Sequence, residues 1–109
     1  LNNPRVTQFL TSKMDVTEAE KLHWYHHWVD VGFTALERRL TLSESNGRFC
    51  FGDSVSLADI CLIPQVYNAL RFNCPLQNYP TICAIYDHCH RIPAFVSASP
   101  ETESDYPAE

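Results

Sequence analysis

A chain of 109 residues fits one ordinary domain, and its 45% hydrophobic and 19% charged residues allow a core and exclude compositional disorder. The formal net charge is −5 and no basic residues cluster, which speaks against a nucleic-acid surface. No apolar run is long enough to cross a bilayer, and no signal-like segment stands at the start. These properties predict a soluble, cytoplasmic domain that binds neither nucleic acid nor a membrane.

The sequence predicts an all-α fold, because almost no segment alternates apolar and polar residues with a period of two. A first helix is expected to start at Asn3 and Pro4, since proline at the first helical position loses no needed donor. A second, long helix is expected from about Thr17 to Leu42, with Thr17 and Glu20 at the spacing of a capping box. Its apolar residues form two neighbouring stripes, which predicts packing against more than one neighbour. The stripes are Leu22, Tyr25, Val29, Gly32, Leu36 and Leu40, and beside them Trp24, Trp28, Val31 and Ala35.

The stretch "FCFGDSVSLADICLIPQ" places the carboxylate of Asp59 in a run of small and apolar residues that otherwise looks buried. A buried charge is costly unless it is paired or hydrogen-bonded. Ser56 and Asp59 have capping-box spacing, so that Asp59 can accept a hydrogen bond from the Ser56 amide. Val55 and Ile60 have the spacing of a hydrophobic staple. The sequence therefore predicts that Ser56 and Asp59 are structural capping residues of a third helix, and not catalytic groups.

That third helix is expected to run to about Phe72, with Pro64 inside it. A fourth helix is expected from Pro80, and a short turn from Pro93. Residues 1–100 would then form one helical domain. The last nine residues, "ETESDYPAE", carry four acids and no base, and are expected to form a flexible acidic tail over 101–109.

Cysteines and histidines raise the question of a metal site. The five cysteines are odd in number and lack a CxxC pair, which favours reduced and mostly buried thiols. His23, His27 and Asp30 share one face of the long helix, but they lack an HExxH motif and more often form a solvated polar face. His88 and His90 alternate along a helix and so point to different sides. The sequence therefore predicts no metal site.

The capping stretch and its continuation resemble a known family. "GDSVSLADICLIPQVYNALRF" is similar to the "GD-x-[VI]-[ST]-x-A-D" helix of glutathione transferase C-terminal domains. "PQVYNALRF", "YPTI" and "IPAFVSASP" are similar to the zeta class, which contains maleylacetoacetate and maleylpyruvate isomerases. "LNN-x-RV" and "WYHHWVDVGFTALE" also resemble that class. The resemblance covers residues 1 to about 100.

The resemblance implies a helical bundle that in relatives follows a thioredoxin-like domain. That domain supplies most of the glutathione site and the thiol-activating segment, and this sequence contains nothing similar to that segment. The chain is therefore expected to be a fragment of a longer glutathione-dependent cis–trans isomerase, inactive alone and a homodimer at full length. A solitary domain without activity is the alternative. Its substrate would be a small dicarboxylate such as maleylacetoacetate or maleylpyruvate.

The same resemblance points to two substrate-binding residues and to no catalytic residue in this chain. Arg71, in "NALRF", is the candidate partner of a substrate carboxylate, because arginine offers a two-pronged donor. A surface arginine at the negative end of a helix is the alternative. His26, in "WYHHW", stands where the family often has Gln or Arg facing the cleft. Asn68 either lines the cleft or has a structural role.

Two other functions remain open at this level. A general glutathione transferase would use the same fold, and its helical half would look much the same. A non-catalytic interaction module of the kind attached to translation factors and synthetases is the other alternative. "NALRF" and "WYHHW" favour the isomerase, because they resemble enzyme motifs and not the general fold.

Overall fold

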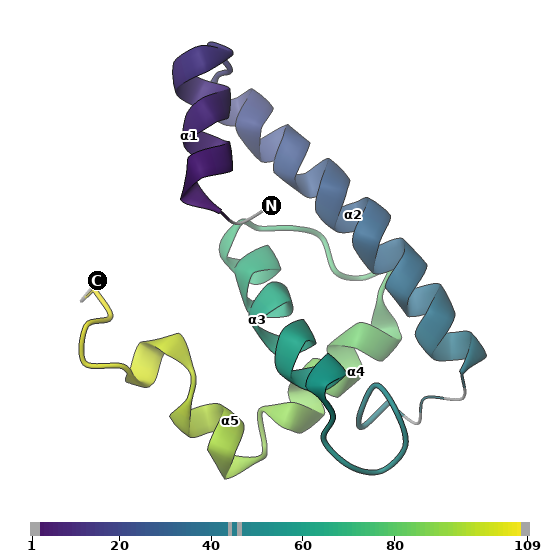
Figure 1. Cartoon of the computed structure of the whole chain (residues 1–109). Helices are drawn as coiled ribbons and strands as arrows, with labels where there is room; N and C mark the ends of the chain where they lie inside the picture. Colours follow the sequence, from purple (N-terminus) through teal and green to yellow (C-terminus); the bar gives the residue numbers. More distant parts are fainter. Residues whose placement is uncertain (1–2, 44, 46, 108–109) are drawn as a thin grey trace.

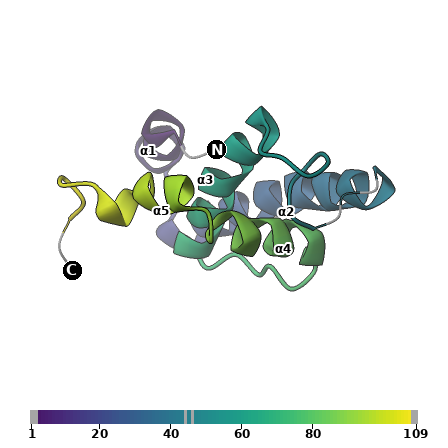
Figure 2. The same ribbon diagram turned by 90° about the horizontal axis from the view of Figure 1, so that it is seen from below.

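The computed structural model describes residues 3–43, 45 and 47–107, and within them it contains helices and no strand. The prediction of an all-α fold is therefore confirmed. Figures 1 and 2 show a long second helix, and in Figure 1 the first and fourth helices lie along it while the fifth lies apart. The elements are α1 (Pro4–Lys13), α2 (Glu18–Leu42), α3 (Leu57–Arg71), α4 (Pro80–Cys89), α5 (Pro93–Ser97) and the 3₁₀ helix η1 (Pro100–Thr102).

The core lies where α4 packs against both α2 and α3, while α1 packs on α2 (Figure 1). Each of the three inner helices turns one apolar face inward, which is the usual way in which helices bury apolar surface. The buried residues are Tyr25, Val29, Phe33 and Leu40 on α2, Leu62, Ile63, Val66 and Ala69 on α3, and Ile82, Ile85 and Cys89 on α4. No helix of the described chain is both long and apolar enough to span a membrane.

The wide apolar sector of α2 is covered only in part. Tyr25 and Val29 of the first stripe are buried, but Trp28 and Val31 of the second stripe are 45% and 48% exposed. Phe33, which belonged to neither stripe, is buried. Its ring packs edge-on against the ring of Tyr79, with the two ring centroids 5.5 Å apart. Helix α2 packs against both α4 and α1, so the expectation of more than one neighbour is confirmed.

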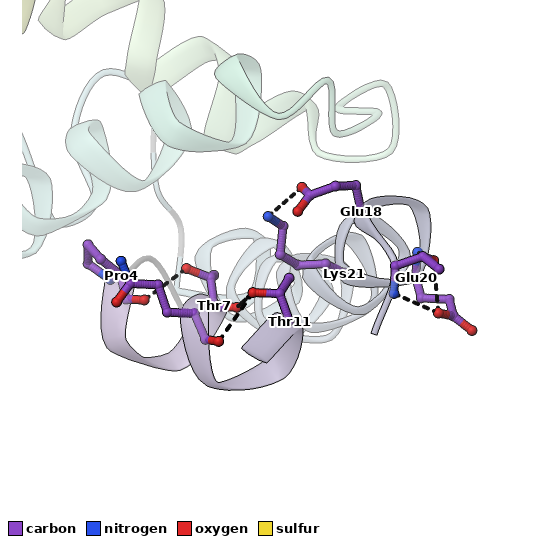
Figure 3. Close-up of polar contacts among 8 residues, drawn as sticks. Pro4, Thr7, Thr11, Glu18, Glu20 and Lys21 are labelled. Atoms are coloured by element: carbon purple, nitrogen blue, oxygen red, sulfur yellow. Dashed lines mark hydrogen bonds and ion pairs between the residues drawn. The ribbon is translucent and has the colours of Figure 1, made fainter. Parts of the chain in front are cut away.

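Local hydrogen bonds set the starts of α1 and α2 as the sequence predicts. Asn3 is the N-cap of α1, which begins at Pro4, and its side chain accepts a hydrogen bond from the amide of Arg5 at 2.9 Å. At α2, Glu20 accepts from the Thr17 amide at 2.9 Å, and the Thr17 hydroxyl accepts from the Glu20 amide at 3.2 Å. Figure 3 shows this box beside the Lys21–Glu18 ion pair of 2.5 Å. Both starts are exposed, so water competes with these bonds.

Asp59 is fully buried and accepts three hydrogen bonds. One carboxylate oxygen accepts from the amide and the hydroxyl of Ser56, both at 2.8 Å, which confirms the predicted cap of α3. The other oxygen accepts from the amide of Cys50 at 2.7 Å, a partner nine residues earlier that the local motif did not indicate. Burial alone would raise the pKa of Asp59, but these hydrogen bonds outweigh it and the pKa is lowered. The carboxylate therefore ties the loop before α3 to the helix.

A carboxylate on α2 caps α4 from outside that helix. Glu37 accepts from the amides of Thr81 at 2.7 Å and Ile82 at 2.9 Å. The residue at the N-cap of α4, Tyr79, makes no capping bond with its side chain. Glu37 thus satisfies free amides at the positive end of α4 and fixes how α2 and α4 meet.

The C-terminal segment returns to the body of the domain. After α5 and η1 it brings the hydroxyl of Tyr106 to 3.2 Å from the hydroxyl of Tyr67 on α3. Residues 108 and 109 of the expected acidic tail lie outside the described residues. The flexibility of residues 101–109, and a domain boundary at residue 100, remain predictions.

Candidate functional site

The principal hollow of the described chain is an open groove of about 680 Å³ between α3 and the segment that carries α5. Most of the residues that line it are apolar, with a few polar groups among them, which is the usual composition of a small-molecule site. The lining residues are Val55, Ile60, Ile63, Pro64, Tyr67, Asn68 and Arg71 on one wall, and His90, Ile92, Ala94, Phe95, Ala98, Ser99 and Pro100 on the other.

Helix α3 forms the first wall because its two faces have different roles. Ile60, Pro64, Tyr67 and Arg71 follow one another at helical spacing and share the groove face. The opposite face, with Leu62, Val66 and Ala69 among its residues, is buried in the core. The capped start of α3 and its packed inner face therefore hold the groove face in place.

Arg71 is an exposed residue at the last position of α3 and lines the groove. Its guanidinium carbon lies 5.9 Å from the centroid of the Tyr67 ring, one turn earlier, at the distance of a cation–π contact. A cation also suits the negative end of the helix. Asn68 also lines the groove, which was one of the two roles that the sequence allowed for it. The arrangement can bind an anion beside apolar groove walls.

His26 lies elsewhere. It lines a second hollow of about 360 Å³ between α2 and the α3–α4 loop, together with residues such as Asp30, Cys74 and Tyr79. Its Nε2 is 2.6 Å from the carbonyl oxygen of Phe72, so this nitrogen carries the proton and donates. The structure thus does not bring His26 and Arg71 into one groove, but His26 binds the residue that follows Arg71. A contact between His26 and substrate remains a prediction.

His90 is a groove residue that the sequence did not indicate as one. Its half-buried ring packs on Tyr86 with centroids 4.2 Å apart, and its Nδ1 is 3.3 Å from the carbonyl oxygen of Tyr86. The sequence suggests His90 only as a possible metal ligand, because of its spacing from His88 and Cys89. Its place in the groove follows from how the chain turns after α4, which no local pattern specifies.

Metal binding receives no support from the described residues, and two of the buried cysteines are unsuited to thiol chemistry. They contain no group of three or more His, Cys, Asp or Glu side chains that could hold a metal ion. All five cysteines are free, and Cys50, Cys74 and Cys89 are buried. Burial raises the pKa of Cys50 to about 12 and that of Cys89 to about 11. These two thiols stay protonated near neutral pH and offer no thiolate nucleophile.

Comparison with known proteins identifies the fold. The family described as "Glutathione S-transferase, C-terminal domain" matches residues 2–97. The chain belongs to this family. The prediction of a glutathione-transferase C-terminal domain is therefore confirmed.

Two kinds of relative place this glutathione S-transferase domain more narrowly. It is 45% identical to a probable maleylacetoacetate isomerase of Vibrio cholerae, over 96% of this chain and 48% of that protein. A zeta-class maleyl pyruvate isomerase structure matches with a TM-score of 0.93 and 37% identity, over 97% of this chain and 50% of that one. A maleylacetoacetate isomerase of Methylobacterium extorquens AM1 with bound malonate and glutathione matches with a TM-score of 0.91 and 32% identity, over 99% and 50%. The chain spans about half the length of these relatives.

Proposed function

We propose that this chain is the C-terminal half of a zeta-class, glutathione-dependent cis–trans isomerase that acts on maleylacetoacetate or maleylpyruvate in aromatic amino-acid catabolism. The proposal is supported by relatives that carry these names at 37–45% identity. The observation that carries it is Arg71, the one Lys or Arg among the described residues that line the groove. A diacid needs such a cation, and an apolar wall beside it suits its carbon chain.

The chemistry divides between this chain and the half that it does not contain. Glutathione would supply the thiol that adds reversibly to the cis double bond. The groove of this chain has one guanidinium and otherwise mostly apolar walls, which fits the carboxylate and carbon chain of a diacid better than a tripeptide with several charges. We therefore assign glutathione binding mainly to the preceding domain. Arg71 would orient the substrate carboxylate, while Ile63, Pro64 and Phe95 would keep water from its carbon chain.

His26 enters the proposal at the same end of α3. Its hydrogen bond to Phe72 fixes the backbone next to Arg71. We propose that it contributes to substrate binding from that position. Replacing His26 by alanine should then raise the KM for the diacid less than replacing Arg71 does, because the guanidinium itself remains.

The test is the Arg71→Ala variant of the full-length protein, assayed with maleylpyruvate and glutathione. Loss of charge-assisted hydrogen bonds worth about 1.5–3 kcal/mol should lower kcat/KM by roughly 10- to 150-fold, mainly through KM. Arg71→Lys should recover part of this loss, because it keeps the charge but not the fork. Arg91→Ala, an exposed arginine outside the groove lining, is the matched control. Unchanged kcat and KM in Arg71→Ala would remove Arg71 from substrate binding.

We also propose that the full-length enzyme is a cytoplasmic homodimer. Exposed apolar side chains on α1 and α2 support a protein contact, with Phe9 at 56%, Trp28 at 45% and Val31 at 48% exposure. Sedimentation equilibrium of the full-length protein tests this. A monomer at micromolar concentration contradicts it.

A further inference from the structure

The groove that Arg71 lines is built partly by the C-terminal segment. Ser99 and Pro100 line the groove, and Tyr106, six residues later, reaches Tyr67 on α3. In Figure 1 the segment after α5 turns back on the α3 side of the molecule. Residues 39 positions apart in the sequence thus meet at Tyr67, a residue of the groove lining.

The segment has its own hydrogen bonds that hold this course. The Thr102 hydroxyl lies 2.9 Å from the carbonyl oxygen of Ser97 and 2.8 Å from that of Ser99, where α5 ends. The amide of Glu103 donates to the carbonyl of Pro100 at 3.1 Å, and the amide of Tyr106 donates to the carbonyl of Glu103 at 3.1 Å. Two successive turns therefore lead from the groove wall to Tyr106.

Tyr67 connects this segment to the guanidinium. Its hydroxyl faces Tyr106 at 3.2 Å, and its ring lies 5.9 Å from the Arg71 guanidinium carbon. The hydrogen bond with Tyr106, followed by burial and the nearby carboxylate of Glu101, raises the pKa of Tyr67. Tyr67 thus stays a neutral phenol near pH 7. A phenolate would attract the guanidinium and compete with a bound carboxylate, whereas a neutral ring presents only its π face.

We propose that Tyr67 is a positioning residue that holds the Arg71 guanidinium toward the groove, and that Tyr106 of the C-terminal segment holds Tyr67 in this role. The segment thereby sets the affinity of the groove for a substrate carboxylate. This inference rests on the proposed function, since it concerns how Arg71 meets a diacid. It adds to that function two residues, Tyr67 and Tyr106, that act through Arg71 and not on the reacting atoms.

The experiment compares Tyr67→Phe, Tyr106→Phe and the double variant in the full-length protein. The readouts are KM and kcat for maleylpyruvate with glutathione, and the inhibition constant of malonate as a simple dicarboxylate probe. Each single variant should raise KM and the malonate constant about two- to fivefold, with kcat nearly unchanged, because one exposed hydrogen bond is lost. The double variant should be no worse than Tyr67→Phe alone, because Tyr67→Phe already removes the contact with Tyr106.

A fourth variant isolates the ring. Tyr67→Leu removes both the hydroxyl and the π face, and should raise KM about tenfold. Tyr67→Phe keeps the ring and the fold, so it preserves the test if the leucine variant does not fold. Asp105→Asn, an exposed neutralisation next to Tyr106, is the control and should leave KM unchanged.

The outcomes separate the inference from the proposed function. If Arg71→Ala raises KM while both phenylalanine variants match the wild type, the positioning role is overturned and the function stands. Additive effects in the double variant, or an equal effect of Asp105→Asn, also overturn it. If Arg71→Ala changes nothing, the proposed function itself fails, whatever the tyrosine variants do.

Discussion

Replacing Asp59 by asparagine tests the structural reading of the capped α3 most directly. The carboxylate is 0% exposed and accepts from the amides of Cys50 and Ser56 and from the Ser56 hydroxyl. An asparagine of nearly the same shape keeps one oxygen and gains an NH₂ donor. If its oxygen faces Ser56, the NH₂ meets the amide of Cys50, donor against donor. Either orientation leaves buried groups mismatched.

The size of the effect follows from those contacts. A hydrogen bond to a charged group contributes about 1.5–3 kcal/mol, and a buried donor without a partner costs about 1–3 kcal/mol, so Asp59→Asn should lower the free energy of unfolding by about 3–5 kcal/mol. A domain has only about 5–15 kcal/mol in total. The melting temperature should fall by roughly 15–30 °C.

Urea unfolding followed by circular dichroism at 222 nm measures this difference, with linear extrapolation to water. The matched control is Glu20→Gln in the capping box of α2, where the same motif lies in solvent. Water can replace the lost acceptor there, so its effect should be a small fraction of that of Asp59→Asn. If the two variants lose equal stability, or Asp59→Asn loses less than about 0.5 kcal/mol, the argument from buried hydrogen bonds is wrong.

Other consequences can be measured on the same protein. Because the folded pKa of Asp59 lies below its ordinary value of 3.8, its stabilisation is present above about pH 4 and is lost as the pH falls through the folded pKa. Urea unfolding at a series of pH values measures this loss, and Asp59→Asn should lack it. An alkylating reagent should modify the exposed Cys61 well before Cys50, because Cys50 is buried and has a pKa of about 12. Peptide mass spectrometry measures the two alkylation rates, and equal rates contradict this prediction. Glu37→Gln should lower the free energy of unfolding by about 1–2 kcal/mol, because the amide of Thr81 loses a charged acceptor. An unchanged midpoint of urea unfolding contradicts the capping role of Glu37.

The candidate site shows where sequence reasoning stops. Arg71 could be selected from "NALRF" by resemblance, and the structure puts it on a groove. His90 and Tyr106 carried no local signal, because each depends on where the chain turns after α4 and after η1. His26 was selected by its motif, but the packing of α2 beside the end of α3 directs its Nε2 to the carbonyl of Phe72. Motifs identify residue types, whereas cavities depend on contacts between distant segments.

The sequence by itself determined the helical class and the start of each main helix, because capping and proline effects act within a few residues. The local sequence alone indicates the helix starts at Thr17 with Glu20, at Ser56 with Asp59 and at Pro80. Only the tertiary structure decided that Asp59 also binds the amide of Cys50, and that Trp28 stays exposed while Phe33 is buried. A helical wheel shows which side chains share a face, but which face is covered depends on the neighbouring helices.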